Sequence, residues 1–218
     1  MEKPITSQGC PLDKDKIYEA LFIFIDKVLS IYRPSTCELG EDKITQDIEI
    51  SLNDQAHNND TSFAFQNQHK IENYTTDIGV YLKLSKNIFC EIEAKRLPTP
   101  KNSERDEREY VIVDKEKFKG NGGIQRFKEG KHARNLSCSI MFGYIQDNNT
   151  DYWLLKINRW IAELAIADNA FWSRGDCLKK YDPDKDNRFL SVHKRKDETI
   201  ITLHHYWIKL QNTMPILI

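Results

Sequence analysis

Long hydrophobic runs are missing from this sequence, and no stretch approaches the roughly 20 apolar residues that a membrane-spanning helix requires. Residues 1–16 also lack the basic start and apolar centre of a signal peptide. We therefore expect a cytoplasmic protein with no membrane contact. The five cysteines are widely spaced and include no C-x-x-C pair, so zinc and redox motifs are not indicated and reduced thiols are expected.

Internal repeats and long low-complexity segments are absent as well, so nothing in the sequence indicates a repeat architecture. With 218 residues and 39% hydrophobic side chains, the chain is long enough to bury one sizeable core. We expect a single domain over residues 1–218.

A strong excess of one charge is also lacking, because the net charge of -1 argues against a uniformly basic nucleic-acid binder. The distribution is nevertheless uneven. Residues 1–60 carry 12 acidic and 6 basic side chains, whereas residues 115–134 carry seven Lys or Arg and two Glu. The second segment predicts a local basic surface that can meet phosphates. The alternative is a solvated helix face that binds nothing.

Hydrophobic periodicity predicts a mixed α/β protein. Residues 16–32 place apolar side chains at helical spacing, and Arg33-Pro34 should end that helix. The charge-rich segment 102–109 has no periodicity and is expected to be an exposed loop. The helix after Gly122 should have Asn121 near its N-cap. Helices are expected at 16–32, 41–53, 122–134 and 152–167, and strands at 61–71, 77–84, 89–97, 136–145, 189–192 and 199–210.

One helix carries a carboxylate in an unusual position. Ile44, Ile48 and Leu52 form an apolar stripe, and Glu41 lies three residues earlier on the same helix face. Glu41 is therefore either a site residue or an N-terminal charge that the helix dipole favours.

The strands 77–84 and 89–97 are predicted to form an antiparallel hairpin with a three-residue connection. Pairing Leu84 with Ile88 matches every apolar residue with an apolar partner. The other face then carries three opposed pairs: Tyr81 with Glu91, Gly79 with Glu93, and Asp77 with Lys95. Asp77 and Glu93 become diagonal neighbours, and Gly79 leaves open space beside Glu93.

This polar face suits a divalent cation. Mg²⁺ takes carboxylate oxygens, backbone carbonyls and waters, and it usually retains several waters for substrate phosphates. Asp77 and Glu93 can supply the carboxylates, and Ala94 its carbonyl. Lys95 points to the same side and can act on the attacking water or on charge that develops on a phosphate. The alternative is a solvated face held by salt bridges, with Asp77 opposite Lys95.

At these residues the chain resembles the PD-(D/E)XK nuclease superfamily, which has the restriction-endonuclease-like fold. T-D-I-G-V at 76–80 matches the first acid of the signature, and E-I-E-A-K at 91–95 matches the second acid, any residue and lysine. Thr76 stands where the superfamily name has proline. The resemblance implies a restriction-endonuclease-like α/β core, in which helices flank a mixed central β-sheet.

The order of the predicted elements resembles that fold over residues 38–168, which would be the shared core. Residues 1–37 would then be a helical N-terminal extension, and residues 169–218 a β-rich C-terminal extension.

The resemblance also implies roles for individual residues. Asp77 and Glu93 would hold Mg²⁺ or Mn²⁺ with the Ala94 carbonyl, and Lys95 would assist in-line attack of water on a phosphodiester. Two further acids, Glu41 and Glu91, would add ligands or hold metal-bound water. Four residues of the basic segment are expected to contact nucleic acid: Gln125, Arg126, Lys128 and Lys131.

These expectations describe a metal-dependent endonuclease that acts on DNA, as a homodimer or with a partner protein, in restriction or defence against foreign DNA. A different class of function is a catalytically silent module of the same fold that binds nucleic acid or assembles with partner proteins. The apolar tail at 214–218 supports that alternative. A carbohydrate-active enzyme would use paired carboxylates without a lysine, so Lys95 counts against it. Three histidines lack partners at metal-ligand spacing and are expected to be structural or surface residues: His132, His204 and His205.

Overall fold

The computed structural model describes residues 14–33, 40–71, 74–100, 105–114, 116 and 122–210. The chain divides into two compact units, Met1–Tyr32 and Arg33–Ile218. In the first unit, helix α1 (Lys14–Ile31) confirms the helix predicted at 16–32. Within the described residues, no helix combines the length and the apolar character needed to cross a membrane.

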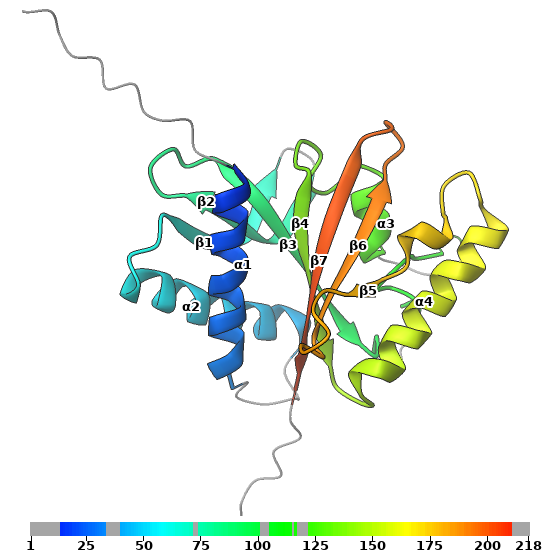
Figure 1. Ribbon diagram of the computed structural model, residues 1–218, viewed down its shortest axis with the longest axis horizontal. Coiled ribbons are helices and arrows are strands. Elements are labelled where there is room, and N and C mark those ends of the chain that lie inside the picture. Colours follow the sequence, from blue (N-terminus) through cyan, green and yellow to red (C-terminus); the bar gives the residue numbers. More distant parts are fainter. Residues whose placement is uncertain are drawn as a thin grey trace, which may run out of the picture. The chain divides into compact units, whose positions relative to one another are not determined.

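The second unit is built on one seven-stranded mixed sheet, which confirms the predicted α/β class (Figure 1). The strands lie in the order β1, β2, β3, β4, β7, β6, β5. β4 pairs in parallel with β3 and with β7, and the remaining pairs are antiparallel. The strands are β1 (Phe63–Ile71), β2 (Tyr74–Leu82), β3 (Ile88–Leu97), β4 (Cys138–Ile145), β5 (Lys179–Lys180), β6 (Arg188–Lys194) and β7 (Ile200–Lys209). The helices of this unit are α2 (Glu41–Asn58), α3 (Gly123–Lys128), α4 (Thr150–Ala167) and the short 3₁₀ helix η1 (Arg174–Asp176).

The centre of the sheet is apolar because its middle strand is covered on both faces. All eight residues of β4 are buried, as expected for a strand with parallel neighbours on both sides. A Cβ at Gly143 would lie only 2.5 Å from Cδ1 of Trp207 on β7. Glycine therefore allows the Trp207 ring to lie against the β4 backbone.

The two faces of the sheet carry different helices. Met141 and Ile145 of β4 belong to a hydrophobic cluster that includes Trp153 of α4. From the same strand, the hydroxyl of Tyr144 lies 2.8 Å from Oγ1 of Thr45 on α2. Because successive side chains of a strand point to opposite faces, α2 and α4 cover opposite faces of the sheet.

The hairpin of β2 and β3 forms, but its predicted register is wrong by two residues from Ile78 to Val80 and by three at Tyr81, which follows an irregularity in the pairing. Val80 pairs with Cys90, whereas the prediction pairs it with Ile92. The connection spans 83–87 rather than three residues. β2 therefore ends before Leu84, which was expected on the apolar face but has 98% of its surface exposed.

Two other predictions need correction. The helix predicted at 122–134 is shorter, because α3 ends at Lys128 and Gly130 has a φ of +68° that breaks the helix. Its N-cap is Gly122, while Asn121 lies outside the described residues. The segment predicted as an exposed loop at 102–109 contains buried side chains within its described part, residues 105–109.

The remaining predicted elements are confirmed within a few residues at their ends. The C-terminal strands β6 and β7 form an antiparallel pair, as expected. β7 also pairs with β4 in the middle of the sheet, so the segment predicted as a β-rich extension completes the central sheet of this unit.

Candidate active site

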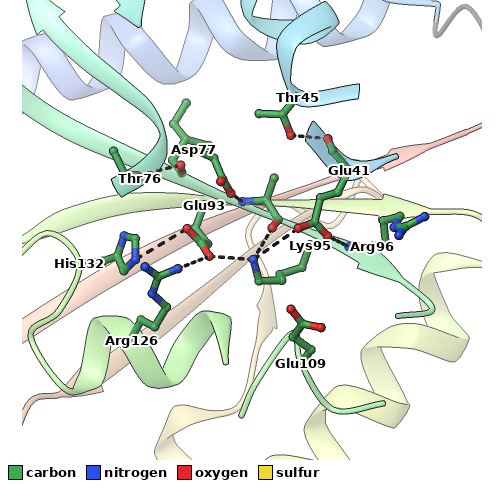
Figure 2. Close-up of polar contacts among 12 residues, drawn as sticks. Glu41, Thr45, Thr76, Asp77, Glu93, Lys95, Arg96, Glu109, Arg126 and His132 are labelled. Atoms are coloured by element: carbon green, nitrogen blue, oxygen red, sulfur yellow. Dashed lines mark hydrogen bonds and ion pairs between the residues drawn. The ribbon is translucent and has the colours of Figure 1, made fainter. Parts of the chain in front are cut away.

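The four predicted catalytic residues, Glu41, Asp77, Glu93 and Lys95, gather where β2 turns away from β3 (Figure 2). The pairing of these strands stops at Ile78 and Ile92, whereas β3 stays paired with β4 on its other side. Side chains bond the backbone groups of β3 along this open edge. From β2, Thr76 Oγ1 donates to Ile92 O at 3.1 Å and Asp77 Oδ2 accepts from Ala94 N at 2.7 Å. From α2, Glu41 Oε2 accepts from Arg96 N at 3.0 Å. Backbone N–H groups therefore fix both predicted carboxylates beside β3.

Glu93 and Lys95 form a buried ion pair next to this edge. Lys95 Nζ donates to Glu93 Oε1 at 2.7 Å and to the Ala94 carbonyl at 2.8 Å, and it lies 3.6 Å from Glu41 Oε1. Arg126 of α3 donates from Nη1 to the same Glu93 oxygen at 3.1 Å. Only 1% of Glu93 and 6% of Lys95 are exposed, so the solvated face considered as the alternative is not what the fold forms.

Burial and neighbouring charges separate the pKa values of the two acids. Burial, followed by the charge of Glu93, raises the pKa of Asp77 to about 7. Burial also acts to raise the pKa of Glu93, but Lys95, His132 and Arg126 together outweigh it and hold this pKa at about 2. Burial acts to lower the pKa of Lys95, yet the carboxylates around it, Glu93 first, raise it well above its usual value. Glu93 is therefore ionised and Lys95 protonated at neutral pH, while Asp77 can exchange a proton.

A second group of charges borders Glu41. Arg105 donates from Nε and Nη2 to the two carboxylate oxygens of Glu109, each at 2.6 Å, and its Nη2 lies 3.9 Å from Glu41 Oε2. Glu109 is buried. Sequence reasoning missed both residues because they fall in the segment interpreted as an exposed loop. The four-residue spacing of Arg105 and Glu109 was the one local signal.

His132 is the other site residue that sequence reasoning missed. It is fully buried, with Nδ1 3.6 Å from Glu91 Oε2 and Nε2 3.8 Å from Glu93 Oε2. The rings of Tyr74 and Phe127 pack against its imidazole. Among the described residues, neither ring nitrogen has a hydrogen-bond partner, and the same holds for Glu93 Oε2. One imidazole ring therefore separates the carboxylates of Glu91 and Glu93.

The predicted opening over Gly79 is filled. A Cβ at Gly79 would lie 2.9 Å from Cβ of His69 and 3.1 Å from Cδ1 of Ile88. Gly79 also pairs with Glu91 rather than with Glu93. The expectation of open space at this glycine is wrong, because the neighbouring strand β1 places His69 there.

Three of the predicted nucleic-acid contacts lie on α3, namely Gln125, Arg126 and Lys128, and two of these bond neighbouring site or loop residues. Arg126 bonds Glu93, as described above, and so belongs to the site itself. Gln125 is tied to its neighbours, since its Oε1 accepts from Val113 N at 3.3 Å and its Nε2 donates to Glu129 Oε1 at 3.1 Å.

The other two predicted contacts differ in exposure. Lys128 is 1% exposed and donates from Nζ to Asp176 Oδ1 at 2.8 Å. That burial is incompatible with the predicted contact to nucleic acid. Lys131 is exposed and forms an ion pair with Glu129. The lysines at 115, 117 and 119 lie outside the described residues.

The donor groups fit the predicted cation in their chemistry. Glu93 Oε1 and the Ala94 carbonyl both bond one cationic nitrogen, Lys95 Nζ, so the two oxygens already converge on a positive charge. Glu93 Oε2 is a buried oxygen without a hydrogen-bond partner in the described part of the chain. Within that part, no three His, Cys, Asp or Glu side chains lie close enough to hold one ion. The predicted set instead combines the carboxylates of Asp77 and Glu93 with one backbone carbonyl, and it requires Lys95 Nζ to move off these oxygens.

Comparisons of the chain with protein-family models, curated proteins and solved structures found no match. The resemblance described above therefore rests on the residues of the hairpin and on their geometry.

Proposed function

We propose that this protein is a metal-dependent nuclease that hydrolyses phosphodiester bonds at the open edge of β3. The observation that carries the proposal is the convergence of Glu93 Oε1 and the Ala94 carbonyl on the Lys95 ammonium, with Asp77 held beside them by Ala94 N. A divalent ion of the Mg²⁺ or Mn²⁺ type, held by Asp77, Glu93 and the Ala94 carbonyl, would neutralise phosphate charge and activate water.

Lys95 acts in this proposal as a fixed positive charge. Without a bound ion, the surrounding carboxylates, Glu93 first, raise the pKa of Lys95 against the effect of burial, so the side chain carries a positive charge in that state. Its ammonium stabilises the negative charge that develops on the phosphate oxygens during attack. Glu41 Oε1, 3.6 Å from Lys95 Nζ, keeps the ammonium near the strand edge.

Arg126 has a complementary role. Its guanidinium donates to Glu93 Oε1 from α3, and about a fifth of the side chain is exposed. It can therefore bond Glu93 and also reach a phosphate oxygen of a bound strand, since guanidinium groups present several donors. Together Arg126 and Lys95 would place two cations against the anionic substrate.

We further propose that DNA is the substrate, that the protein cuts it internally as a homodimer or with a partner protein, and that it serves in restriction or defence against foreign DNA. These points rest on the resemblance of Asp77 and Glu93-Ala94-Lys95 to the superfamily signature.

The test is a cleavage assay on plasmid, linear and single-stranded DNA and on RNA, each with added Mg²⁺. We expect cleavage that EDTA abolishes and that falls by about 100-fold or more in Lys95→Ala and in Asp77→Ala, as for removal of a charge-stabilising group. Lys156→Ala, on α4, is the matched control and should retain wild-type activity. Cleavage that survives both site substitutions would overturn the mechanism.

A second candidate is the catalytically silent module considered from the sequence. The observation that favours it is that Lys95 Nζ already bonds Glu93 Oε1 and the Ala94 carbonyl. The ammonium therefore occupies the oxygens that would hold an ion. This candidate predicts no calorimetric signal on titration with Mg²⁺ or Mn²⁺ and no cleavage of any substrate. The apolar tail at 214–218 that first suggested it lies outside the described residues.

A further inference from the structure

A pocket of about 490 Å³ opens beside the candidate active site. This volume is within the range of small-molecule sites, roughly 300–1,000 Å³. Tyr74, His69 and Ile88 supply aromatic and apolar surface to its wall, and Glu91 supplies a carboxylate. The exposed residues Arg134 and Asn135 complete the lining with polar groups. Flat surface, one acid and two hydrogen-bonding side chains are the features that a planar polar ligand requires.

The carboxylate of Glu91 is fixed and keeps bonding capacity. Its Oε1 accepts from the Tyr74 hydroxyl at 3.0 Å and its Oε2 accepts from Ala133 N at 3.0 Å. The side chain is only 3% exposed, so it cannot turn away to solvent. A carboxylate offers about four lone-pair sites, and two remain after these bonds. Glu91 can therefore accept two further N–H groups that lie side by side.

The pocket is one imidazole ring away from the residues proposed to act on the phosphate. His132 lies between Glu91 and Glu93, at 3.6 and 3.8 Å from their oxygens. In a nucleotide, one sugar separates the phosphate from the base. A strand whose phosphate reaches Glu93 and Lys95 can therefore place a neighbouring base near Glu91.

We propose that this pocket binds an unpaired guanine base of the nucleic-acid substrate, next to the phosphodiester that is cut. The inference rests on the proposed nuclease function and adds a substrate class to it. Guanine is the base whose pairing edge carries two adjacent N–H donors, which match the two remaining sites of Glu91. Its neighbouring carbonyl oxygen needs a donor, which Asn135 or Arg134 at the same pocket supplies. Tyr74 and His69 provide rings against which a base can stack.

This pairing also predicts the state of the substrate. Glu91 would occupy the edge that guanine uses in a duplex, so the base must be unpaired or rotated out of the helix when it is bound. Single-stranded or locally opened nucleic acid is therefore the expected substrate. Adenine, cytosine and uracil each present a single donor group at this edge, and we expect each to bind more weakly by about tenfold or more.

The test measures binding without cleavage, so its outcome is independent of the nuclease assay. The four nucleoside 5′-monophosphates are titrated into the full chain by calorimetry, with free arginine as a competitor for the carboxylate. We expect guanosine 5′-monophosphate to bind at least about tenfold tighter than the other three. Glu91→Gln should remove that preference, because an amide presents a donor where guanine also presents one. Glu163→Gln, an exposed change on α4, is the matched control.

Because Glu91 is buried, Asn135→Ala serves as a second variant at an exposed position. It should weaken the binding of guanosine 5′-monophosphate by several-fold and leave the affinity for the other nucleotides unchanged. Equal binding of all four nucleotides, binding of none, or arginine binding in their place would overturn the guanine site. If cleavage occurs without any nucleotide preference, the nuclease proposal stands and this one fails. If guanosine 5′-monophosphate binds selectively but nothing is cut, the guanine site stands and the nuclease proposal fails.

Discussion

Lys95 is the residue at which the two proposed functions diverge. Its ammonium bonds Glu93 Oε1 and the Ala94 carbonyl, two of the three groups predicted to hold a metal ion. An ammonium and a divalent ion cannot share these oxygens at bonding distance, so they compete for them. Burial makes this competition strong. Both the Glu93 carboxylate and the Lys95 ammonium would be costly to leave in this position without an opposite charge.

This competition predicts that metal binding and catalysis respond differently to loss of the lysine. Lys95→Ala should bind Mn²⁺ as tightly as the wild type or more tightly, because the substitution frees two oxygens, while cleavage is lost. Asp77→Ala should weaken Mn²⁺ binding by about tenfold or more, since it removes a ligand. Calorimetric titration with Mn²⁺ measures both effects. If Lys95→Ala and Asp77→Ala lose binding equally, Lys95 does not compete with the ion.

At the scale of elements, the hairpin shows which parts of a fold a sequence pattern determines. A shift of two residues in register keeps every side chain on the same face, because side chains alternate with a period of two. From Ile78 to Val80 the alternation in β2 and β3 therefore predicted the correct faces, and with them the neighbourhood of Asp77, Glu93 and Lys95, whereas the irregularity between Val80 and Tyr81 places Ile88 on the polar face, opposite to the prediction. The alternation could not distinguish the observed register from the predicted register two residues away. The length of the 83–87 connection decides that choice, and no residue in it marked the difference.

The same limit explains which site residues were missed. Asp77 and Glu93 lie within 20 residues of one another in sequence, and a local pattern connects them. Arg105, Glu109 and His132 reach the site through long-range packing that no periodicity encodes. Charged residues in an irregular segment were read as exposed, although the structure buries Glu109 against Arg105.

Two helix N-caps offer a controlled test of packing at the start of α3. Gly122 and Gly40 both precede helices and both have an extended backbone with negative φ. A Cβ at Gly122 would lie 2.3 Å from Cα of Ile112, whereas a Cβ at Gly40 meets nothing within 4 Å. Gly122→Ala should therefore destabilise the protein by about 1–3 kcal/mol more than Gly40→Ala, the range measured for overpacked cores.

Urea denaturation of both variants measures the difference in the free energy of unfolding. Because both substitutions place alanine at an N-cap, the cost of the cap itself is similar and cancels. Equal stabilities would show that the segment around Ile112 moves without cost. That segment carries Tyr110, whose backbone carbonyl accepts from Ile124 N, so α3 and Arg126 would then be less firmly placed than the structure indicates.

At the scale of the whole molecule, a buried chain of hydrogen bonds joins β6 and β7 to η1 and to the turn that contains Tyr110. It runs through side chains with contacts of 2.6–2.9 Å, in the order Trp207, Tyr110, His205, Ser191, His193, Asp176 and Lys128. Trp207 can only donate and the Asp176 carboxylate can only accept. With each histidine neutral and carrying one proton, the bonds have one direction: His193 donates to Asp176, Ser191 donates to His193, His205 donates to Ser191, and Tyr110 donates to His205.

Neutral histidines make the stability of this core depend on pH. Burial lowers the pKa of His193. Burial, together with the nearby His193 and His204, lowers the pKa of His205 well below 6.5. Burial, with Arg188 nearby, lowers the pKa of His204 to about 3. The folded state therefore binds fewer protons than the unfolded state, and the contribution of these histidines is complete above pH 6.5 and falls as the pH drops below it. Asp77, whose pKa is raised to about 7, acts in the opposite direction in the same range.

We therefore expect three histidines to outweigh one carboxyl, so that the free energy of unfolding falls between pH 6.5 and pH 5, by up to about 1.4 kcal/mol per pH unit for each histidine. Urea denaturation across this range measures the slope. His204→Gln should reduce the slope by up to the share of one histidine, whereas His57→Gln on the exposed side of α2 should leave it unchanged. A slope that His204→Gln does not alter would mean that this histidine is protonated in the folded protein. Arg188, which lies 3.5 Å from His204 Nδ1, would then face a second positive charge in the core, an arrangement that the neutral histidine avoids.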